Sequence, residues 1–430
     1  MAKFLFAVFP VSGHVNPGLP IARELVRRGH DVRWYSTMRF KRAIEETGAR
    51  FVRYRMAVPI DETHFDMLPD RPRAGLKQLQ WDIENIFVGM VPGQFTDLES
   101  ELRHEPADAI VGDNASIVGA LIGERYNLPF IAFGISVLTT SSRDAAPFGL
   151  GLMPSSSPLG RLRNRALNWI NDNVIFRAAA EKNEEVRREL GFGPPKYATF
   201  DFAKDAALYL QSSVPSFEYP RTDMPQNIRW IGASVPEPPA NWTPPAWWPE
   251  LKSRRVVLVT QGTINNDYDQ LIRPAIRALA KWENVLVVVT TGSKPVSEVG
   301  IDPLPENVRV ERFIPYARLM PDVDVLLTNG GYGSVQIALA HAVPVVAIGK
   351  TEEKPEVANR LTYSGAGIGL KVLVPTEAQI RGAVTRVLGN PAYRNRALEI
   401  GKELAGLNPA TEAANHIEGL LGGWRLAATA

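Results

Sequence analysis

Short apolar segments that read as strands alternate along this chain with segments of helical hydrophobic spacing, and the alternation occurs twice. In the first half it covers residues 3–37 and 107–136, and in the second half it restarts at residues 254–263 and continues to residue 350. Strands separated by helices in this way form a parallel sheet with helices on both faces. The sequence therefore predicts an α/β protein made of two facing, Rossmann-like, doubly wound domains that share one cleft.

A proline-rich segment separates the two halves. Residues 214–249 are dense in proline and have no regular hydrophobic period, which is typical of a linker. We therefore expect a first domain over residues 1–213, this linker, and a second domain over residues 250–408. The last segment, 409–430, is expected to form a helix that packs back on the first domain. A chain of 430 residues is long enough for two such cores.

Composition narrows the class of function. The net charge is only +2, which gives no strong attraction to nucleic acid or to a membrane surface. The chain has no cysteine, so disulfides, thiolate catalysis and cysteine-ligated metals are excluded. The apolar run at the N-terminus is short, and no apolar stretch is long enough to span a bilayer. We therefore expect a cytoplasmic monomer or homodimer that binds small molecules, with no nucleic-acid partner and no membrane span.

The glycine-rich loop within residues 325–344 is the clearest ligand-binding signal. A buried strand is expected to end at Thr328, glycines follow at 330, 331 and 333, and a helix is expected from about Ser334. Glycines let backbone amides approach a ligand, and a helix N-terminus presents unpaired N–H groups, so the segment suits a phosphate. A second loop, residues 261–263, follows another strand of the same domain. The pair predicts a diphosphate site; the alternative is two tight turns with no ligand.

Other nucleotide and metal motifs are missing or weak. The loop after the first strand, residues 10–18, does not match the G-x-G-x-x-G dinucleotide fingerprint, and the second strand ends without an acidic residue for a ribose. No Walker A motif is present. Asp322 and Asp324 precede a buried strand, where acidic residues are usually solvated, so we expect no metal ligand there. A nicotinamide-dependent oxidoreductase is therefore not expected.

Four motifs occur in a characteristic order: GHVNP at residues 13–17, QGT at 261–263, a long stretch at 312–346, and EKPEVANRL at 353–361. Together they resemble the two-domain GT-B glycosyltransferases, and more closely the bacterial branch of the UDP-glycosyltransferases that modifies macrolides and other natural products. The resemblance covers nearly the whole chain. It implies an inverting sugar transfer, with the nucleotide donor on the second domain and the acceptor on the first.

By this resemblance His14 stands at the position of the general base, and Asp113 at the position of the acid that orients it. The chemistry agrees, because imidazole titrates near neutral pH and can take the proton of an acceptor hydroxyl. A carboxylate on the other ring nitrogen fixes the tautomer and stabilises the imidazolium. The alternatives are a loop residue that caps the next helix for His14 and a helix-capping residue for Asp113.

The resemblance also implies a set of donor-binding residues. Phe313 is expected to stack on the nucleotide base, with Tyr316 beside it, and the glycine loops are expected to bind the diphosphate. The full set is Gly262, Thr263, Phe313, Ile314, Tyr316, Asn329, Gly331, Gly333, Ser334, Glu353 and Lys354.

Several positions depart from the family pattern, among them Tyr316, where a glutamine is common. Asn329 stands where many relatives have a histidine that faces a donor phosphate, and Ile337 stands where an acid commonly binds the ribose hydroxyls. The pair that contacts the sugar, usually Asp-Gln, is Glu353-Lys354. We expect that pair to face the sugar; the alternative is an ordinary surface contact between the two side chains. No metal and no cofactor other than the nucleotide sugar, UDP-glucose or a dTDP-sugar, is expected.

Irregular segments rich in aromatic residues and methionine, at about residues 55–95 and 137–180, are expected to bind the acceptor. The acceptor-binding candidates are Phe65, Trp81, Phe87, Met90, Phe148 and Met153. Packing within the first domain's own core is the alternative for each of them. The expected substrate is a bulky hydrophobic natural product of the macrolide, ansamycin or polyphenol type. A sugar-nucleotide epimerase or hydrolase on the same scaffold, and an inactive partner protein, are the competing functions.

Overall fold

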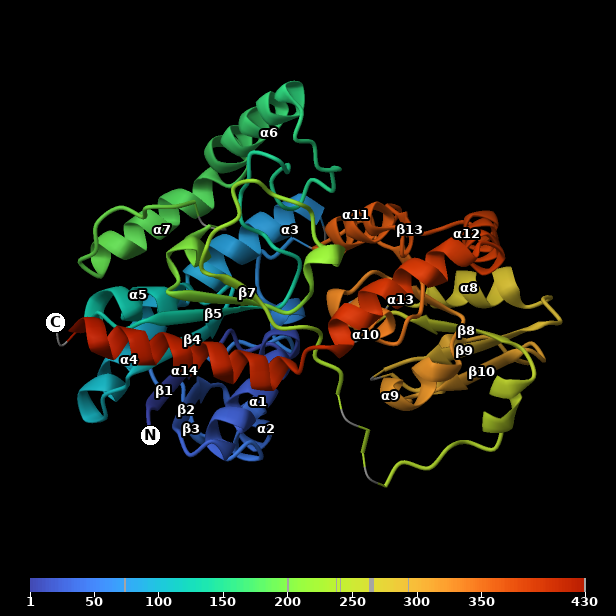
Figure 1. Ribbon diagram of the computed structural model, residues 1–430, viewed down its shortest axis with the longest axis horizontal. Helices are drawn as coiled ribbons and strands as arrows, with labels where there is room; N and C mark the ends of the chain where they lie inside the picture. Colours follow the sequence, from blue (N-terminus) through green and yellow to red (C-terminus); the bar gives the residue numbers. More distant parts are fainter. Residues whose placement is uncertain are drawn as a thin grey trace.

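The computed structural model describes residues 1–72, 75–198, 201–236, 238–239, 241–262, 267–292 and 294–428. These residues form two α/β domains side by side, each built around one sheet (Figure 1). Every strand pairing in both sheets is parallel. The α/β class and the two doubly wound domains expected from the sequence are confirmed.

The first sheet has seven strands in the order β3-β2-β1-β4-β5-β6-β7. Its strands are β1 Lys3–Ala7, β2 Asp31–Ser36, β3 Arg50–Arg53, β4 Ala109–Asp113, β5 Phe130–Gly134, β6 Leu208–Gln211 and β7 Ile228–Trp230. Its helices are α1 Ser12–Arg27, α2 Lys41–Glu45, α3 Gly75–Asp82, α4 Val91–His104, α5 Ile117–Tyr126, α6 Pro158–Ile170 and α7 Arg177–Glu189. Two π-helical turns, η3 Ile83–Val88 and η4 Asn171–Ile175, extend α3 and α6.

Side chains on β1 show how this sheet separates two cores. Leu5 and Ala7 pack in the cluster that includes α4, α5 and α7, whereas Phe4 and Phe6 pack in the cluster that includes α1. Successive side chains of a strand point to opposite faces, so an unbroken apolar strand buries both faces. Burial of the sheet on both sides explains the continuous apolar run at the N-terminus.

The second sheet has six strands in the order β10-β9-β8-β11-β12-β13. They are β8 Arg255–Thr260, β9 Val285–Thr290, β10 Val308–Glu311, β11 Val325–Thr328, β12 Val345–Ile348 and β13 Gly367–Leu370. The helices are α8 Ile272–Leu279, α9 Tyr316–Leu319, α10 Tyr332–Ala340, α11 Lys354–Ser364, α12 Glu377–Gly389, α13 Pro391–Ala405 and α14 Pro409–Ala428. One core packs on α8 and α12, and the other on α10, α11 and α13.

Two segments outside residues 1–213 belong to the first domain: one lies in the expected linker, and the other is the C-terminal helix. The segment expected to be a linker contains β7, which pairs with β6, so the first sheet extends beyond residue 213. The C-terminal helix α14 runs back along the first domain beside α1, as expected (Figure 1). Ala413, Ala414 and Ile417 of α14 are fully buried in that domain's core.

A buried cluster of charges joins the two domains. Arg360 on α11 donates from Nε to Glu218, 2.5 Å away, and from Nη1 to Glu356 at 3.0 Å. Its guanidinium lies 4.2 Å from the centre of the Tyr219 ring. Glu356 in turn accepts the backbone N–H groups of Gly149 and Gly151. Residues 149–151 and 218–219 precede the second domain in sequence, so this cluster fixes α11 against the first domain.

We predict that Arg360→Met lowers the free energy of unfolding by about 3 kcal/mol or more, because it removes the nearest cation from the buried carboxylates of Glu218 and Glu356. Urea unfolding followed by circular dichroism measures the change. The matched control is Arg381→Met, which breaks an exposed ion pair to Glu377 on α12 and is expected to cost less than about 1 kcal/mol. Equal losses in the two variants would contradict the role assigned to the buried cluster.

Candidate functional site

His14 lies in the first turn of α1, at the carboxyl-end edge of the first sheet. The sequence suggested a helix from about residue 16, but α1 begins at Ser12, so His14 is helical and not a loop residue. Its side chain is 16% exposed, and its Nδ1 lies 3.2 Å from Oδ1 of Asp113. Nδ1 is buried and makes no aligned hydrogen bond in this structure. The Asp113 carboxylate is therefore placed to hold the proton on Nδ1, which leaves Nε2 to accept one.

Asp113 ends β4 and is fully buried. Its Oδ2 accepts the backbone N–H of Phe9 at 2.7 Å, and its Oδ1 accepts that of Ala115 at 2.6 Å. The helix that follows is capped by Ser116, whose Oγ accepts the N–H of Gly119. Asp113 thus fixes the loops after β1 and β4, and the capping role considered as its alternative belongs to Ser116.

Aromatic rings surround the imidazole. Phe9 stacks on Phe87 with ring centroids 4.3 Å apart, and the His14 ring lies 5.3 Å from Phe9 and 6.2 Å from Phe87. Phe87 belongs to the π-helical turn η3, a distortion that occurs often at functional sites. Of the six acceptor candidates, Phe87 is the one for which a ring contact with His14 is measured.

Trp81 lies on α3, which precedes η3 in the same helical segment, and it lines a separate cavity. It lines a cavity of about 460 Å³ together with Val174, Ile175 and Phe176. The cavity lies between the α3–η3 segment and the η4–α7 segment of the first domain. Its mixed apolar and charged lining suits an amphiphilic small molecule.

The remaining acceptor candidates lie apart. Met90 is only 5% exposed and packs in the core of the first domain, so the expectation that it contacts an acceptor does not fit its burial. Phe148 packs against the core of the second domain. Phe65 lies under the guanidinium of Arg71, 5.0 Å from the ring centroid, and Met153 is 39% exposed. The structure does not gather these four around His14.

The two glycine loops of the second domain lie side by side at the carboxyl ends of β8 and β11. Gly262 has φ = +78°, and Asn329 lies next to it, donating from Nδ2 to the carbonyl of Gln261. Gly330 has φ = +87°, a conformation that favours glycine. Gly331 is the N-cap of α10, and the N–H groups of the first helical turn have no partner within the helix. These amides lie where the sequence analysis predicts the anion seat.

Ser334 and Gly333 belong to the first turn of α10. Ser334 Oγ donates to the carbonyl of Gly331 at 2.9 Å, which holds the loop at the helix start. Thr263, also expected at this seat, lies outside the described residues.

The segment after β10 presents the expected base-stacking ring. Phe313 is 59% exposed, which leaves its face free for a ligand, whereas Ile314 is 2% exposed and packs in the core. Tyr316 donates its hydroxyl to Thr260 at 2.9 Å, and burial raises its pKa. Phe313 therefore offers a side chain to a nucleotide, while Tyr316 is held under the loop and Ile314 can contribute only its backbone.

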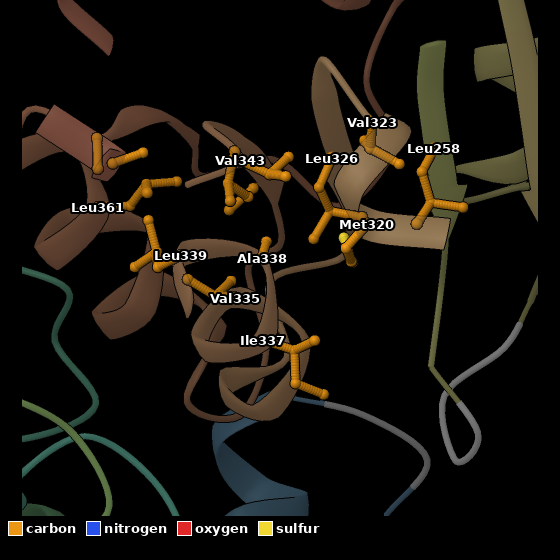
Figure 2. Packing of buried hydrophobic residues seen from close by; sticks show 14 of the residues in the cluster. Leu258, Met320, Val323, Leu326, Val335, Ile337, Ala338, Leu339, Val343 and Leu361 are labelled. Atoms are coloured by element: carbon orange, nitrogen blue, oxygen red, sulfur yellow. The ribbon is translucent and has the colours of Figure 1, made fainter. Parts of the chain in front are cut away.

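Ile337 is buried, with 8% exposure, where a ribose-binding acid was expected from the resemblance. Figure 2 shows it at the edge of the second domain's apolar cluster, projecting from α10 away from Leu339 and Leu361. Burial among apolar side chains leaves no charged group at this point of α10.

Glu353 and Lys354 lie at the start of α11, close to both domains' sites. Glu353 is the N-cap, and its pKa is raised by burial and by the neighbouring Glu352 carboxylate. The His14 imidazole acts in the opposite direction and lowers the pKa of Glu353. Lys354 is 5% exposed and pairs with Glu352, Nζ to Oε2, at 2.7 Å. His14 and Asp113 are brought together in the first domain, and the loops at Gly262 and Asn329 in the second.

One residue near His14 was missed by the sequence analysis. Glu62 accepts hydrogen bonds from both the backbone N–H and the hydroxyl of Ser12, at the start of α1, and pairs with Arg39 at 3.0 Å. Glu62 therefore anchors the turn that carries His14. Its segment has no regular hydrophobic period, so no sequence signal marked it.

Two searches of the described residues found no candidates. In that part of the chain no cluster of three or more His, Cys, Asp or Glu side chains could hold a metal ion. Asp322 pairs with Lys252, and Asp324 with Arg255, so both are occupied by cations of the protein. None of the described helices is long and apolar enough to cross a membrane.

Comparison with known proteins adds relatives over the full length. The chain is 44% identical to 4'-demethylrebeccamycin synthase of Lentzea aerocolonigenes, over 98% of this chain and 100% of the relative. It is 32% identical to UDP-glucosyltransferase A1 of Starmerella bombicola, over 96% of this chain and 92% of the relative. Residues 278–420 match the family model described as erythromycin biosynthesis protein CIII-like, C-terminal domain.

Solved structures share the fold. The calicheamicin glycosyltransferase CalG4 superposes with a TM-score of 0.76 at 22% identity, over 98% of both chains. The spinosyn rhamnosyltransferase SpnG, complexed with thymidine diphosphate, superposes with a TM-score of 0.71 at 18% identity, over 97% of this chain and all of that one. Both have the two-domain architecture expected here.

We predict that Asp113→Asn leaves the protein folded but lowers its free energy of unfolding by about 1–3 kcal/mol, because one carboxylate oxygen that accepts a backbone N–H becomes an amide donor. Chemical denaturation measures the loss. Asp108→Asn, which removes a carboxylate that accepts the Lys3 N–H at the opposite end of β1, is the matched control for loop anchoring alone. A variant at 113 as stable as the wild type would mean that the two backbone contacts contribute nothing.

Proposed function

Because the chain belongs to the family of nucleotide-sugar-dependent glycosyltransferases with the GT-B fold, we propose that it transfers glucose from UDP-glucose to a hydroxyl of a bulky, hydrophobic natural product. The observation that carries the proposal is the His14–Asp113 pair, 3.2 Å apart. It lies at the carboxyl-end edge of the first sheet, and the His14 imidazole lowers the pKa of Glu353 on the other domain.

The chemistry follows from these positions. Nε2 of His14 accepts the proton of the acceptor hydroxyl as its oxygen bonds to the anomeric carbon of the sugar. The bond between that carbon and the diphosphate oxygen breaks, and the nucleoside diphosphate leaves with the electron pair. Attack on the face opposite the leaving group inverts the anomeric centre. The Asp113 carboxylate stabilises the imidazolium that forms.

The second domain's role is to stabilise the leaving group. The N–H groups at the start of α10 and around Gly262 are fixed by the fold and aimed at one edge of the sheet. Amide dipoles preorganised in this way stabilise charge as it develops. In this proposal the exposed face of Phe313 stacks on the base, and Glu353, the N-cap of α11, faces the sugar.

The identity of the substrates is supported by the relatives' names and by the first domain's surface. Relatives are named 4'-demethylrebeccamycin synthase and demethyllactenocin mycarosyltransferase, which points to a natural-product acceptor, and several are named UDP-glucosyltransferase, which points to UDP-glucose. The Phe87 ring beside His14 suits an apolar acceptor.

An epimerase or hydrolase would bind the same donor but would need no aromatic surface beside the base. Incubation with UDP-glucose and a panel of hydrophobic acceptors, followed by mass spectrometry, separates the functions. A hexose added to an acceptor supports transfer, while an isomerised nucleotide sugar or free glucose alone would contradict it. No reaction at all would favour an inactive partner protein.

We predict that His14→Ala abolishes transfer, because the acceptor loses its base, while UDP affinity measured by calorimetry stays within about threefold, because the diphosphate is bound by the other domain. The control is His30→Ala. His30 also pairs with a carboxylate, that of Glu418 at 2.9 Å, but lies beyond the opposite end of α1. Transfer at the wild-type rate in the His14 variant would rule out its role as base.

We also predict that dTDP-glucose is used within about tenfold of UDP-glucose, a difference of about 1.4 kcal/mol. Ile337 offers no charge to a ribose hydroxyl, so the 2′-hydroxyl of UDP contributes little. Competition kinetics with both donors measures the ratio, and Ile337→Glu is expected to raise the preference for UDP, since a hydrogen bond to a charged group contributes about 1.5–3 kcal/mol. A wild-type preference for UDP above a hundredfold would show that other residues bind the ribose.

A further inference from the structure

Lys354 lies directly against the loop that forms the anion seat. A Cβ atom built at Gly349 would be 2.6 Å from Cβ and 2.8 Å from Cδ of Lys354, and also 2.6 Å from the carbonyl oxygen of Asn329. A Cβ built at Gly330 would be 3.5 Å from Cβ of Lys354. The methylene groups of the lysine therefore fill the space that these two glycines leave between the ends of β11 and β12.

This position matters because of charge. A nucleoside diphosphate carries at least two negative charges, and the groups identified at the seat are neutral: backbone amides and the Asn329 side chain. Lys354 is 5% exposed and its methylene groups contact the loop, and a buried cation interacts more strongly with a nearby anion than a solvated one would. An ammonium on a flexible stem suits a phosphate as a point charge.

The present partner of Lys354 is one that a ligand can replace. Its Nζ lies 2.7 Å from Glu352, whose side chain is 50% exposed, and 3.4 Å from Thr351 Oγ1. Glu352 has φ = +56°, a left-handed conformation that costs energy in a residue other than glycine. Such strain is found at ligand-binding and switch segments.

We propose that Lys354 binds the diphosphate of the donor, and not a sugar hydroxyl, by exchanging Glu352 for the phosphate oxygens when the donor enters. The inference rests on the proposed function, since it assigns a further residue to the same donor site. Lys354 then balances the charge of the diphosphate as it leaves, and Glu353, the neighbouring N-cap, remains beside the sugar. The lysine supplies the charge that the amides and Asn329 lack.

The test is calorimetry of the full-length chain with UDP and with UMP, repeated with dTDP and dTMP. In Lys354→Met the affinity for UDP is expected to fall at least tenfold, while that for UMP falls less than about threefold. Lys354→Arg keeps the charge and is expected to keep UDP affinity within about threefold of the wild type. Lys350→Met, at an exposed lysine that precedes the same segment, is the matched control and should bind as the wild type does. Thermal unfolding of each variant shows whether it is folded.

The outcomes separate the possible roles. A selective loss of UDP over UMP, reversed by arginine, supports the inference. Equal losses for UDP and UMP would show a structural role, and unchanged affinity for both, with a raised KM for UDP-glucose, would assign Lys354 to the sugar; either result overturns it. A wild-type protein that binds neither UDP nor dTDP would overturn the proposed donor itself, and this inference with it.

Discussion

The site depends on two parallel sheets whose carboxyl-end edges are held toward each other. A parallel sheet collects the loops after all its strands at one edge, and here one edge carries His14 and Asp113 while the other carries the glycine loops and α11. The buried Glu218–Arg360–Glu356 cluster fixes that opposition, because its arginine lies on α11 and its partners anchor the first domain's loops. The same helix begins with Glu353 and Lys354, so one element links domain orientation to donor binding.

Charge is divided between the domains in the way that sugar transfer requires. The first domain places the buried Asp113 carboxylate 3.2 Å from Nδ1 of His14. The second domain presents amides and a lysine, so it favours negative charge on a leaving diphosphate. In the proposed reaction, proton acceptance and leaving-group departure occur on opposite sides of the anomeric carbon. Neither domain would then carry both functions, so transfer would require both.

The sequence predicted those features that depend on local pattern. Strand and helix alternation predicted both sheets, and the motifs placed His14 and Asp113 on the first sheet's edge and Gly331 on the second's. The sequence analysis missed residues whose position in the fold depends on contacts between segments distant in the sequence. Arg360 and Glu218 are separated by 142 residues, and Glu62 reaches Ser12 from a segment with no periodicity. Met90 was expected at the acceptor surface because its segment is rich in aromatic residues and methionine, yet it packs in the core. The sequence does not separate the two positions, because an apolar side chain fits either.

The first domain was expected to end at residue 213, but β7 extends its sheet, and the reason is again physical. Proline-rich segments read as linkers because they lack periodicity, but a strand as short as β7, Ile228–Trp230, leaves no period to detect. The acceptor surface is the least predictable part, because the residues that line the Trp81 cavity come from two segments that only meet in the folded domain.

The most direct test of the account is the anomeric configuration of the product. If His14 activates an acceptor hydroxyl on the face opposite the diphosphate, the α-linked glucose of UDP-glucose must emerge β-linked. Proton NMR of the purified glycoside, from the large coupling between H1 and H2, reads this directly. A β-glucoside agrees with a single in-line displacement between the two domains. An α-glucoside, or glucose released to water with the acceptor unchanged, would contradict it.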